Sequence, residues 1–206
     1  MNVAISIKKS TKSIGKYEAP LISRLCEHFE SLGFKAFPHV RLNIAWGSCL
    51  SDIDTLLIRD SLVTVIEVKS YRDKLARAEK QLEAISDYVD YSYVATDRLP
   101  RHWKSSRSGL LLIKDDVRVV KRASKIVGEP KLDSLIALPK KCLLRFLGQP
   151  HQERLLKYEI ALRIRNLFDD ESIKQCLKEI VLCQGCSHNE CPILGLVSSI
   201  PCYAYS

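Results

Sequence analysis

Residues 51–70, with the sequence SDIDTLLIRDSLVTVIEVKS, carry the clearest pattern of apolar and polar positions in the chain. Leu, Ile, Val and Thr fill two short runs, which the turn-forming residues Arg59, Asp60 and Ser61 separate. This pattern predicts two antiparallel strands joined by a tight turn. A loop of two or four residues centred on Asp60 and Ser61 places Asp54 opposite Glu67. An odd loop length would shift the register by one residue and turn Asp54 to the other face.

The segments before this hairpin predict a helix over residues 17–32 and a strand over residues 34–44. Pro20 fits the first turn of the helix, and Gly33 is expected to end it. One stripe of apolar residues at helical spacing supports the helix: Ile22, Leu25, Phe29 and Leu32.

After the hairpin, the spacing of apolar residues predicts a helix over residues 71–89, followed by a strand over 91–96. A strand, a helix and a second strand in this order predict parallel pairing through a right-handed crossover. Residues 109–113 and 117–120 then predict a small final hairpin.

The remaining chain is expected to be helical from residue 131. Pro139 interrupts the first helical pattern, a longer amphipathic helix follows over 151–168, and another runs from Asp169 to about residue 182. The apolar side of the longer helix would consist of Leu155, Leu156, Ile160, Ile164 and Leu167. The predicted organisation is a basic lead-in over 1–16, a core over 17–122 and a helical C-terminal segment over 131–206.

Composition narrows the class of protein. The 206 residues are enough for one domain, or for one domain with a helical appendage. With 46% apolar and 27% charged residues, the chain has the composition of a folded soluble protein. The net charge of +8 favours a polyanionic partner but does not distinguish nucleic acid from an anionic membrane. The sequence has no run of eighteen apolar residues and no signal-peptide core, so we expect a cytoplasmic protein with reduced cysteines.

The expected pair of facing carboxylates, Asp54 and Glu67, suggests a metal site. Two carboxylates without a cation would repel each other, and a hard divalent ion such as Mg²⁺ takes one or two carboxylates together with water. Lys69, on the same face as Glu67, could orient the attacking water or neutralise charge on a phosphate. The alternative is a solvated ion pair of Glu67 and Lys69 on an exposed strand.

Asp54, followed thirteen residues later by Glu67-Val68-Lys69, resembles the catalytic signature of the PD-(D/E)xK nucleases in its E-x-K form. The resemblance is to small bacterial nuclease-like proteins of this superfamily. It implies a restriction-endonuclease-like α/β core, with a mixed central sheet flanked by helices, and Mg²⁺- or Mn²⁺-dependent hydrolysis of phosphodiester bonds. It also implies that Glu18 of the first helix joins the site and that Gln81 completes its surroundings. For Glu18, the favourable effect of a carboxylate on the first turn of a helix is an alternative explanation.

A basic stretch around an aromatic residue, Arg101-His102-Trp103-Lys104, is a candidate nucleic-acid contact, because it could stack a base and hold phosphates. Lys74 is a further candidate at the border of the helix over 71–89. The alternatives are a Trp103 side chain packed under the sheet and a Lys74 side chain that extends into solvent.

Cysteines cluster near the end of the chain: Cys183, Cys186 and Cys191, the first two spaced as C-x₂-C. This spacing is typical of a thiolate metal site, and the alternative is a cysteine-rich segment without metal. The fourth ligand could be His188, Cys26, Cys49, Cys176 or Cys202. The arrangement is similar to that of PD-(D/E)xK nucleases with an iron–sulphur cluster, which use one cysteine before the core and three after it. Here four residues separate Cys186 from Cys191, rather than five or more, so zinc is almost as well supported as a 4Fe-4S cluster.

The sequence therefore predicts a metal-dependent nuclease acting on nucleic acid, with DNA favoured over RNA and the choice between them left open. A homodimer or a partner protein from a DNA-processing system is compatible with this prediction. Two alternatives from other classes stay open. One is a nucleic-acid-binding module without catalysis, and the other is an adaptor protein built around the cysteine metal site.

Overall fold

A computed structural model describes most of the chain between residues 17 and 183. The described residues are 17–43, 49–70, 73, 75–100, 103, 105, 107–152 and 154–183. Within them, only the backbone is described at 41–43, 49–51 and 180–183. The described chain divides into two compact units. One contains residues 17–41 and 51–127, and the other contains residues 42–43, 49–50 and 128–183.

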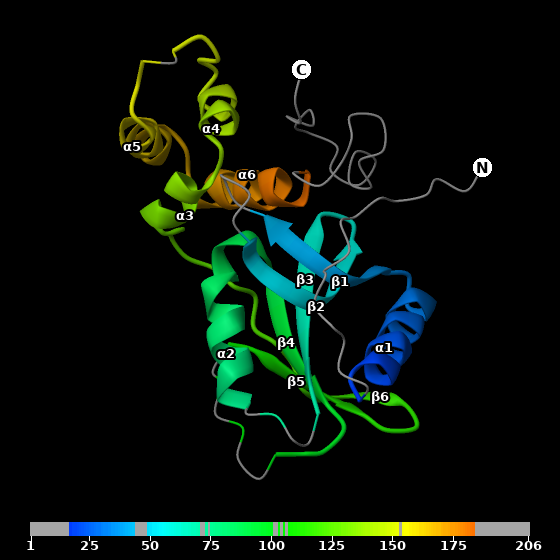
Figure 1. Cartoon of the computed structure of the whole chain (residues 1–206). Helices are drawn as coiled ribbons and strands as arrows, with labels where there is room; N and C mark the ends of the chain where they lie inside the picture. Colours follow the sequence, from blue (N-terminus) through cyan, green and yellow to red (C-terminus); the bar gives the residue numbers. More distant parts are fainter. Residues whose placement is uncertain are drawn as a thin grey trace, which may run out of the picture. The chain divides into compact units, whose positions relative to one another are not determined.

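In the described part of the chain, six strands form one mixed sheet and lie side by side in the order of the sequence (Figure 1). β2 and β3 are antiparallel, β3, β4 and β5 are parallel, and β5 and β6 are antiparallel. Helices flank the sheet, which confirms the predicted α/β class. The strands are β1 (Lys35–Asn43), β2 (Cys49–Arg59), β3 (Leu62–Lys69), β4 (Tyr91–Thr96), β5 (Gly109–Ile113) and β6 (Val117–Lys121).

The hairpin of β2 and β3 has the register that the sequence predicts. Arg59 pairs with Leu62 and Thr55 with Ile66, so the loop contains two residues, Asp60 and Ser61. Asp60 has a φ of 55°, a left-handed conformation that the short polar side chain of Asp tolerates. An even loop keeps the two strands in phase, and the side chains of opposite residues therefore share a face.

Helix α1 (Ala19–Ser31) covers one face of the sheet. Pro20 lies in its first turn, as predicted, and Gly33 follows its end with a φ of 83°. Ile22 and Leu25 are buried and belong to a cluster with sheet residues of β2, β3, β4 and β5: Leu57, Ile66, Val68, Ala95, Leu111 and Ile113. The predicted stripe ends one turn early, because Leu32 follows the last helical turn and is exposed.

Helix α2 (Leu75–Ala84) packs on β3 and β4, and Figure 1 shows it on the other side of the sheet from α1. The prediction of a helix over 71–89 was too long at its C-terminal end. After Ala84 the chain forms a short 3₁₀ helix, η2 (Ser86–Tyr88), and becomes extended at Val89 before entering β4. The Ser86 hydroxyl donates to the carbonyl of Glu83, a local bond of the kind that competes with helix continuation.

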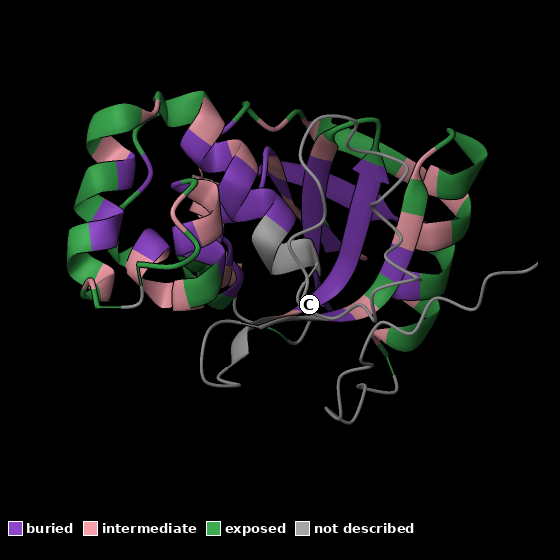
Figure 2. Ribbon diagram, turned by 90° about the horizontal axis from the view of Figure 1, so that it is seen from above, coloured by how far each residue is buried: buried purple, intermediate pink, exposed green. Residues whose placement is uncertain are grey.

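Both faces of the central strands are covered, and Figure 2 shows them as buried, whereas α1 is exposed along its outer side. Gly109, the first residue of β5, lies under the ring of Tyr93, its partner in β4. A Cβ atom at Gly109 would lie 2.3 Å from the Tyr93 ring and 2.7 Å from the backbone nitrogen of Ala123. Glycine is therefore required here by close packing.

The second unit is helical: α3 (Leu132–Ala137), α4 (Lys140–Phe146), α5 (Lys157–Leu167) and α6 (Asp170–Cys183). The predicted helix over 151–168 begins six residues later, at Lys157, because Leu156 is extended and its N–H donates to the Glu159 carboxylate at 2.8 Å. Such a bond from the first-turn Glu fixes the start of a helix. Ile160 and Ile164 are buried as predicted, but Leu156 and Leu167 are exposed.

Among the described residues, the structure contains no helix with the length and apolar character needed to cross a bilayer.

Candidate active site

Three charged side chains, Asp54, Glu67 and Lys69, share one face of the β2–β3 hairpin. Ile66 and Val68 belong to the face that packs on α1, so the alternate residues Glu67 and Lys69 belong to the opposite face. The pairing of β2 and β3 ends at Thr55 and Ile66, and Asp54 and Glu67 are the next residues of the two strands. The strands thus bring together the three residues that the sequence predicted for the site.

Glu67 and Lys69 form a buried ion pair. The Lys69 Nζ lies 2.5 Å from Glu67 Oε1, and the two side chains are 8% and 2% exposed. This excludes the alternative of a solvated ion pair on an exposed strand. Burial of two charges removes their hydration, so an ion pair in this position is expensive and seldom serves stability alone.

Asp54 is also buried, at 7% exposure, and is held by the backbone of the neighbouring strand. Its Oδ2 accepts a hydrogen bond from the Val68 N–H at 2.8 Å, where the ladder of β2 and β3 ends. The bond fixes the carboxylate at the backbone of Val68, the residue after Glu67. A strand residue therefore supplies both the position and the orientation of this acid.

The charge balance of the three side chains differs from the expectation of two unscreened carboxylates. Lys69 already neutralises one carboxylate, so the group formally carries one negative charge rather than two. The repulsion that the sequence suggested is partly relieved within the chain itself. An oxygen-only donor set with a residual negative charge still fits a hard divalent cation such as Mg²⁺ or Mn²⁺.

Glu18 and Gln81, which the family resemblance suggested, occupy different layers. Glu18 is half-buried at the start of α1, whose core residues pack on the face opposite to Glu67. Within the described residues, no three side chains among His, Cys, Asp and Glu lie close enough to share a metal ion. Gln81 is half-buried in α2, and its buried Oε1 has no hydrogen-bond partner in the described part of the chain. Such an acceptor is available to a ligand.

Most of the predicted nucleic-acid contacts, namely Lys74, Arg101 and Lys104, lie outside the described residues. Trp103 is half-buried, and its indole N–H is buried without a hydrogen-bond partner among the described residues. A buried indole N–H normally finds an acceptor, so this group can donate to a ligand. Partial burial is also what the packing alternative requires, and both interpretations of Trp103 stay open.

The predicted cysteine site lies mainly outside the described residues: Cys186 and Cys191 are not described, and only the backbone of Cys183 is. Cys26 is half-buried in α1. Burial, with a smaller contribution from the Glu30 carboxylate, raises the pKa of the Cys26 thiol to about 11. A thiol must lose its proton to bind a metal, so Cys26 would become a ligand only where the metal compensates this cost.

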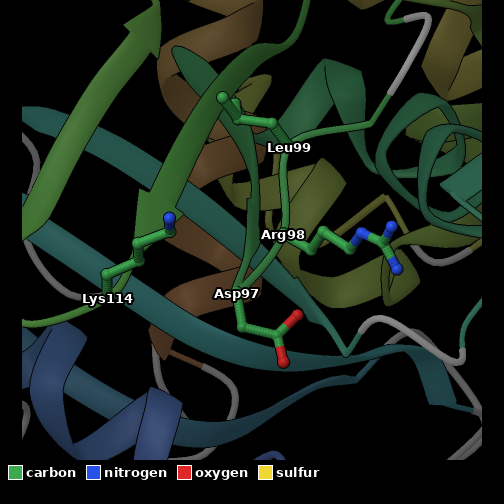
Figure 3. Close-up of a pocket in the computed structure, with 4 residues that line it drawn as sticks. All are labelled: Asp97, Arg98, Leu99 and Lys114. Atoms are coloured by element: carbon green, nitrogen blue, oxygen red, sulfur yellow. The ribbon is translucent and has the colours of Figure 1, made fainter.

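A pocket of about 410 Å³, which the sequence analysis missed, opens at the carboxyl ends of β4 and β5 (Figure 3). It is lined by Asp97, Arg98, Leu99 and Lys114. Asp97 directly follows β4, and Lys114 directly follows β5. Ligands of α/β sheets commonly bind at this end of the strands. That rule was available from the sequence, because the strand boundaries at Thr96 and Ile113 were predicted correctly.

Comparison with known proteins leaves this chain without an assigned family. No protein-family model matches it, and no curated protein is significantly similar. One solved structure that matches is a protein of unknown function from Silicibacter pomeroyi, SPO1766. The two sequences are 22% identical, the match covers 52% of this chain and 71% of that protein, and the TM-score is 0.41. This likeness is too weak to support an argument about fold or function.

Proposed function

We propose that this protein is a metal-dependent nuclease with a restriction-endonuclease-like core, and that it hydrolyses phosphodiester bonds of DNA. The observation that carries the proposal is the buried group of Asp54, Glu67 and Lys69 on one face of the hairpin. Two acids and one lysine, fixed by adjacent strands and removed from water, are costly for stability and well suited to phosphoryl chemistry.

Asp54 and Glu67 would hold a Mg²⁺ or Mn²⁺ ion through their carboxylate oxygens. When bound, such an ion polarises the phosphate and lowers the pKa of a water molecule. The protein's own contribution is to fix the two acids: the Val68 N–H orients Asp54, and Lys69 orients Glu67.

Lys69 has a second role in this proposal. Hydrolysis of a phosphodiester builds negative charge on the phosphate oxygens, and a cation in a poorly hydrated site stabilises that charge strongly. Lys69 is the cation nearest to the two acids in the described hairpin, at 2.5 Å from Glu67. Its ion pair would loosen as the ammonium group shares its hydrogen bonds with the substrate.

The basic character of the whole chain agrees with a polyanionic substrate. A net charge of +8 favours nucleic acid through contacts with phosphates, which are strongly salt-dependent. DNA is proposed ahead of RNA on the family resemblance alone. Substrate preference is therefore part of the test.

The test is a cleavage assay with single- and double-stranded DNA and RNA, in Mg²⁺, in Mn²⁺ and in EDTA. The wild type should cleave in a divalent metal, and Asp54→Asn should not, although Asn can still accept the Val68 hydrogen bond. Asp90→Asn is the matched control. Asp90 is equally buried and accepts the Val63 N–H at 2.8 Å, but it lies five β3 residues away, or about 16 Å.

Cleavage by Asp54→Asn at the wild-type rate would overturn the assignment of the site. Binding of nucleic acid without metal-dependent cleavage would instead identify a binding module. A protein that neither binds nor cleaves would favour the adaptor.

A further inference from the structure

The pocket at the ends of β4 and β5 lies at the same end of the parallel strands as Lys69. β3 and β4 are parallel, and Lys69 pairs with Thr96, the residue immediately before Asp97. Neighbouring strands are separated by about 4.8 Å, so the backbone of Asp97 follows a strand adjacent to the one that carries Lys69. Its volume of about 410 Å³ lies within the range of small-ligand sites.

One carboxylate oxygen of a residue that lines this pocket lacks a donor. Asp97 Oδ1 is buried and has no hydrogen-bond partner in the described part of the chain. A buried oxygen without a partner loses its hydration and gains nothing in return. A ligand that brings an N–H or O–H group to Asp97 would remove this cost.

The same pocket contains cationic groups. Figure 3 shows the side chains of Lys114, Asp97 and Arg98, which line the pocket, extending in different directions. Lys114 is exposed, and its backbone is held from α1, because the Arg24 guanidinium donates to the Lys114 carbonyl. The exposed side chain of Leu99 adds an apolar surface. The lining thus includes cations for an anionic group, an acceptor for a donor group and an apolar side chain for a base.

We infer that this pocket binds one nucleotide unit of the substrate strand. The phosphate would lie on Lys114, with Arg98 as a second cation. A hydroxyl of the sugar or an amino group of the base would donate to Asp97, and the base would contact Leu99. The identification of the ligand as part of a substrate strand rests on the proposed nuclease function. The inferred preference of the pocket for a nucleotide over a simple anion is independent of the proposed nuclease function.

The test uses the full-length protein in EDTA, so that no cleavage occurs. ¹⁵N-labelled protein is titrated separately with a nucleoside 5′-monophosphate, the unphosphorylated nucleoside and inorganic phosphate. The monophosphate should shift the amide signals of residues 97–99 and 114 and bind more tightly than either part alone. Lys114→Ala should weaken it about tenfold, as expected for one charge-assisted hydrogen bond. Arg122→Ala, which removes an exposed cation beyond the opposite end of β6, should leave binding unchanged.

Asp97→Ala separates a nucleotide site from a simple anion site. It should weaken the monophosphate several-fold and strengthen inorganic phosphate, because it removes both an acceptor and a negative charge. If both ligands bind more tightly to Asp97→Ala, or if Lys114→Ala binds like the wild type, the inference is wrong.

These outcomes are independent of catalysis. A wild type that cleaves nucleic acid but shows no nucleotide binding in this pocket would overturn the inference and leave the nuclease intact. A protein that never cleaves nucleic acid but shows the predicted pattern of nucleotide binding would overturn the proposed nuclease function and support the nucleotide pocket.

Discussion

Substitution of either Glu67 or Lys69 should change the stability of the protein, because the two residues form a buried ion pair. In Lys69→Met the Glu67 carboxylate stays buried without its cation, and loss of one partner of a buried pair costs about 3–5 kcal/mol. The double variant Glu67→Gln/Lys69→Met buries no charge at this position and should recover most of that loss. Urea denaturation of both variants in EDTA measures the difference. A double variant that is no more stable than Lys69→Met would show that the pair is not the cause.

Two substitutions of Asp54 should distinguish its contribution to stability from its contribution to catalysis. Asp54→Ala leaves the buried Val68 N–H without an acceptor and should lower the free energy of unfolding by about 1–3 kcal/mol, whereas Asp54→Asn should stay closer to the wild type. Both variants should lose metal-dependent cleavage. Thermal denaturation in EDTA and the cleavage assay check the two statements separately. Equal stability of the Ala and Asn variants would contradict the role of this hydrogen bond.

Glu179 in α6 should make stability depend on pH. Burial raises the pKa of its carboxyl above the ordinary value of 4.5, against the opposing effects of Gln175 and Lys178. The folded state therefore favours the protonated acid, and stability falls as the pH rises through the raised pKa. Glu179→Gln removes this loss, and its Oε1 can still accept from Gln175. We expect the variant to melt at a higher temperature than the wild type at pH 7 and at nearly the same temperature below pH 4.5. A gain of equal size at both pH values would contradict this mechanism.

At the scale of an element, Gly109 sets how closely β5 approaches its neighbours. A methyl group there would meet the Tyr93 ring and the Ala123 backbone, and the backbone cannot move aside as a flexible side chain can. Gly109→Ala should therefore destabilise the protein by about 1–3 kcal/mol, the usual range for overpacking. Chemical denaturation measures the change. Gly33→Ala is an informative control because Gly33 has open space around it, so only backbone strain at its φ of 83° contributes.

The central elements were predictable because their signals are local. Alternation along residues 51–70 and an even turn suffice to place Asp54, Glu67 and Lys69 on one face. The lengths of the helices after the hairpin were not predictable from the apolar pattern. The hydrogen bond from the Ser86 hydroxyl to the Glu83 carbonyl and the bond from the Leu156 N–H to the Glu159 carboxylate set the helix ends instead. The burial of the Glu67–Lys69 pair also could not be derived, because it depends on how the sheet is covered.

At the scale of the whole molecule, we propose that Cys183, Cys186 and Cys191 bind a zinc ion or an iron–sulphur cluster that supports the fold. Thiolates favour such soft centres, whereas the acids of the hairpin favour a hard cation. Protein purified without oxygen should contain zinc, or iron with absorbance at about 400 nm. Metal removal should lower thermal stability while Asp54→Asn leaves metal content unchanged. Elemental analysis showing neither metal would contradict the proposal.

The strands of the sheet follow one another in space as they do along the sequence. Each strand after β1 pairs with the strand synthesised immediately before it, so a chain emerging from the ribosome can extend the sheet from one edge without waiting for a distant segment. Contacts between neighbours in sequence close short loops, which lowers the entropic cost of each addition and favours rapid folding. The slowest additions should be β4 and β5, because parallel strands need a crossover before they can pair. Until β6 is added, the growing sheet presents the buried strand β5 as an open edge, and the basic residues Arg118 and Lys121 of β6 then form a charged border that discourages pairing with other chains.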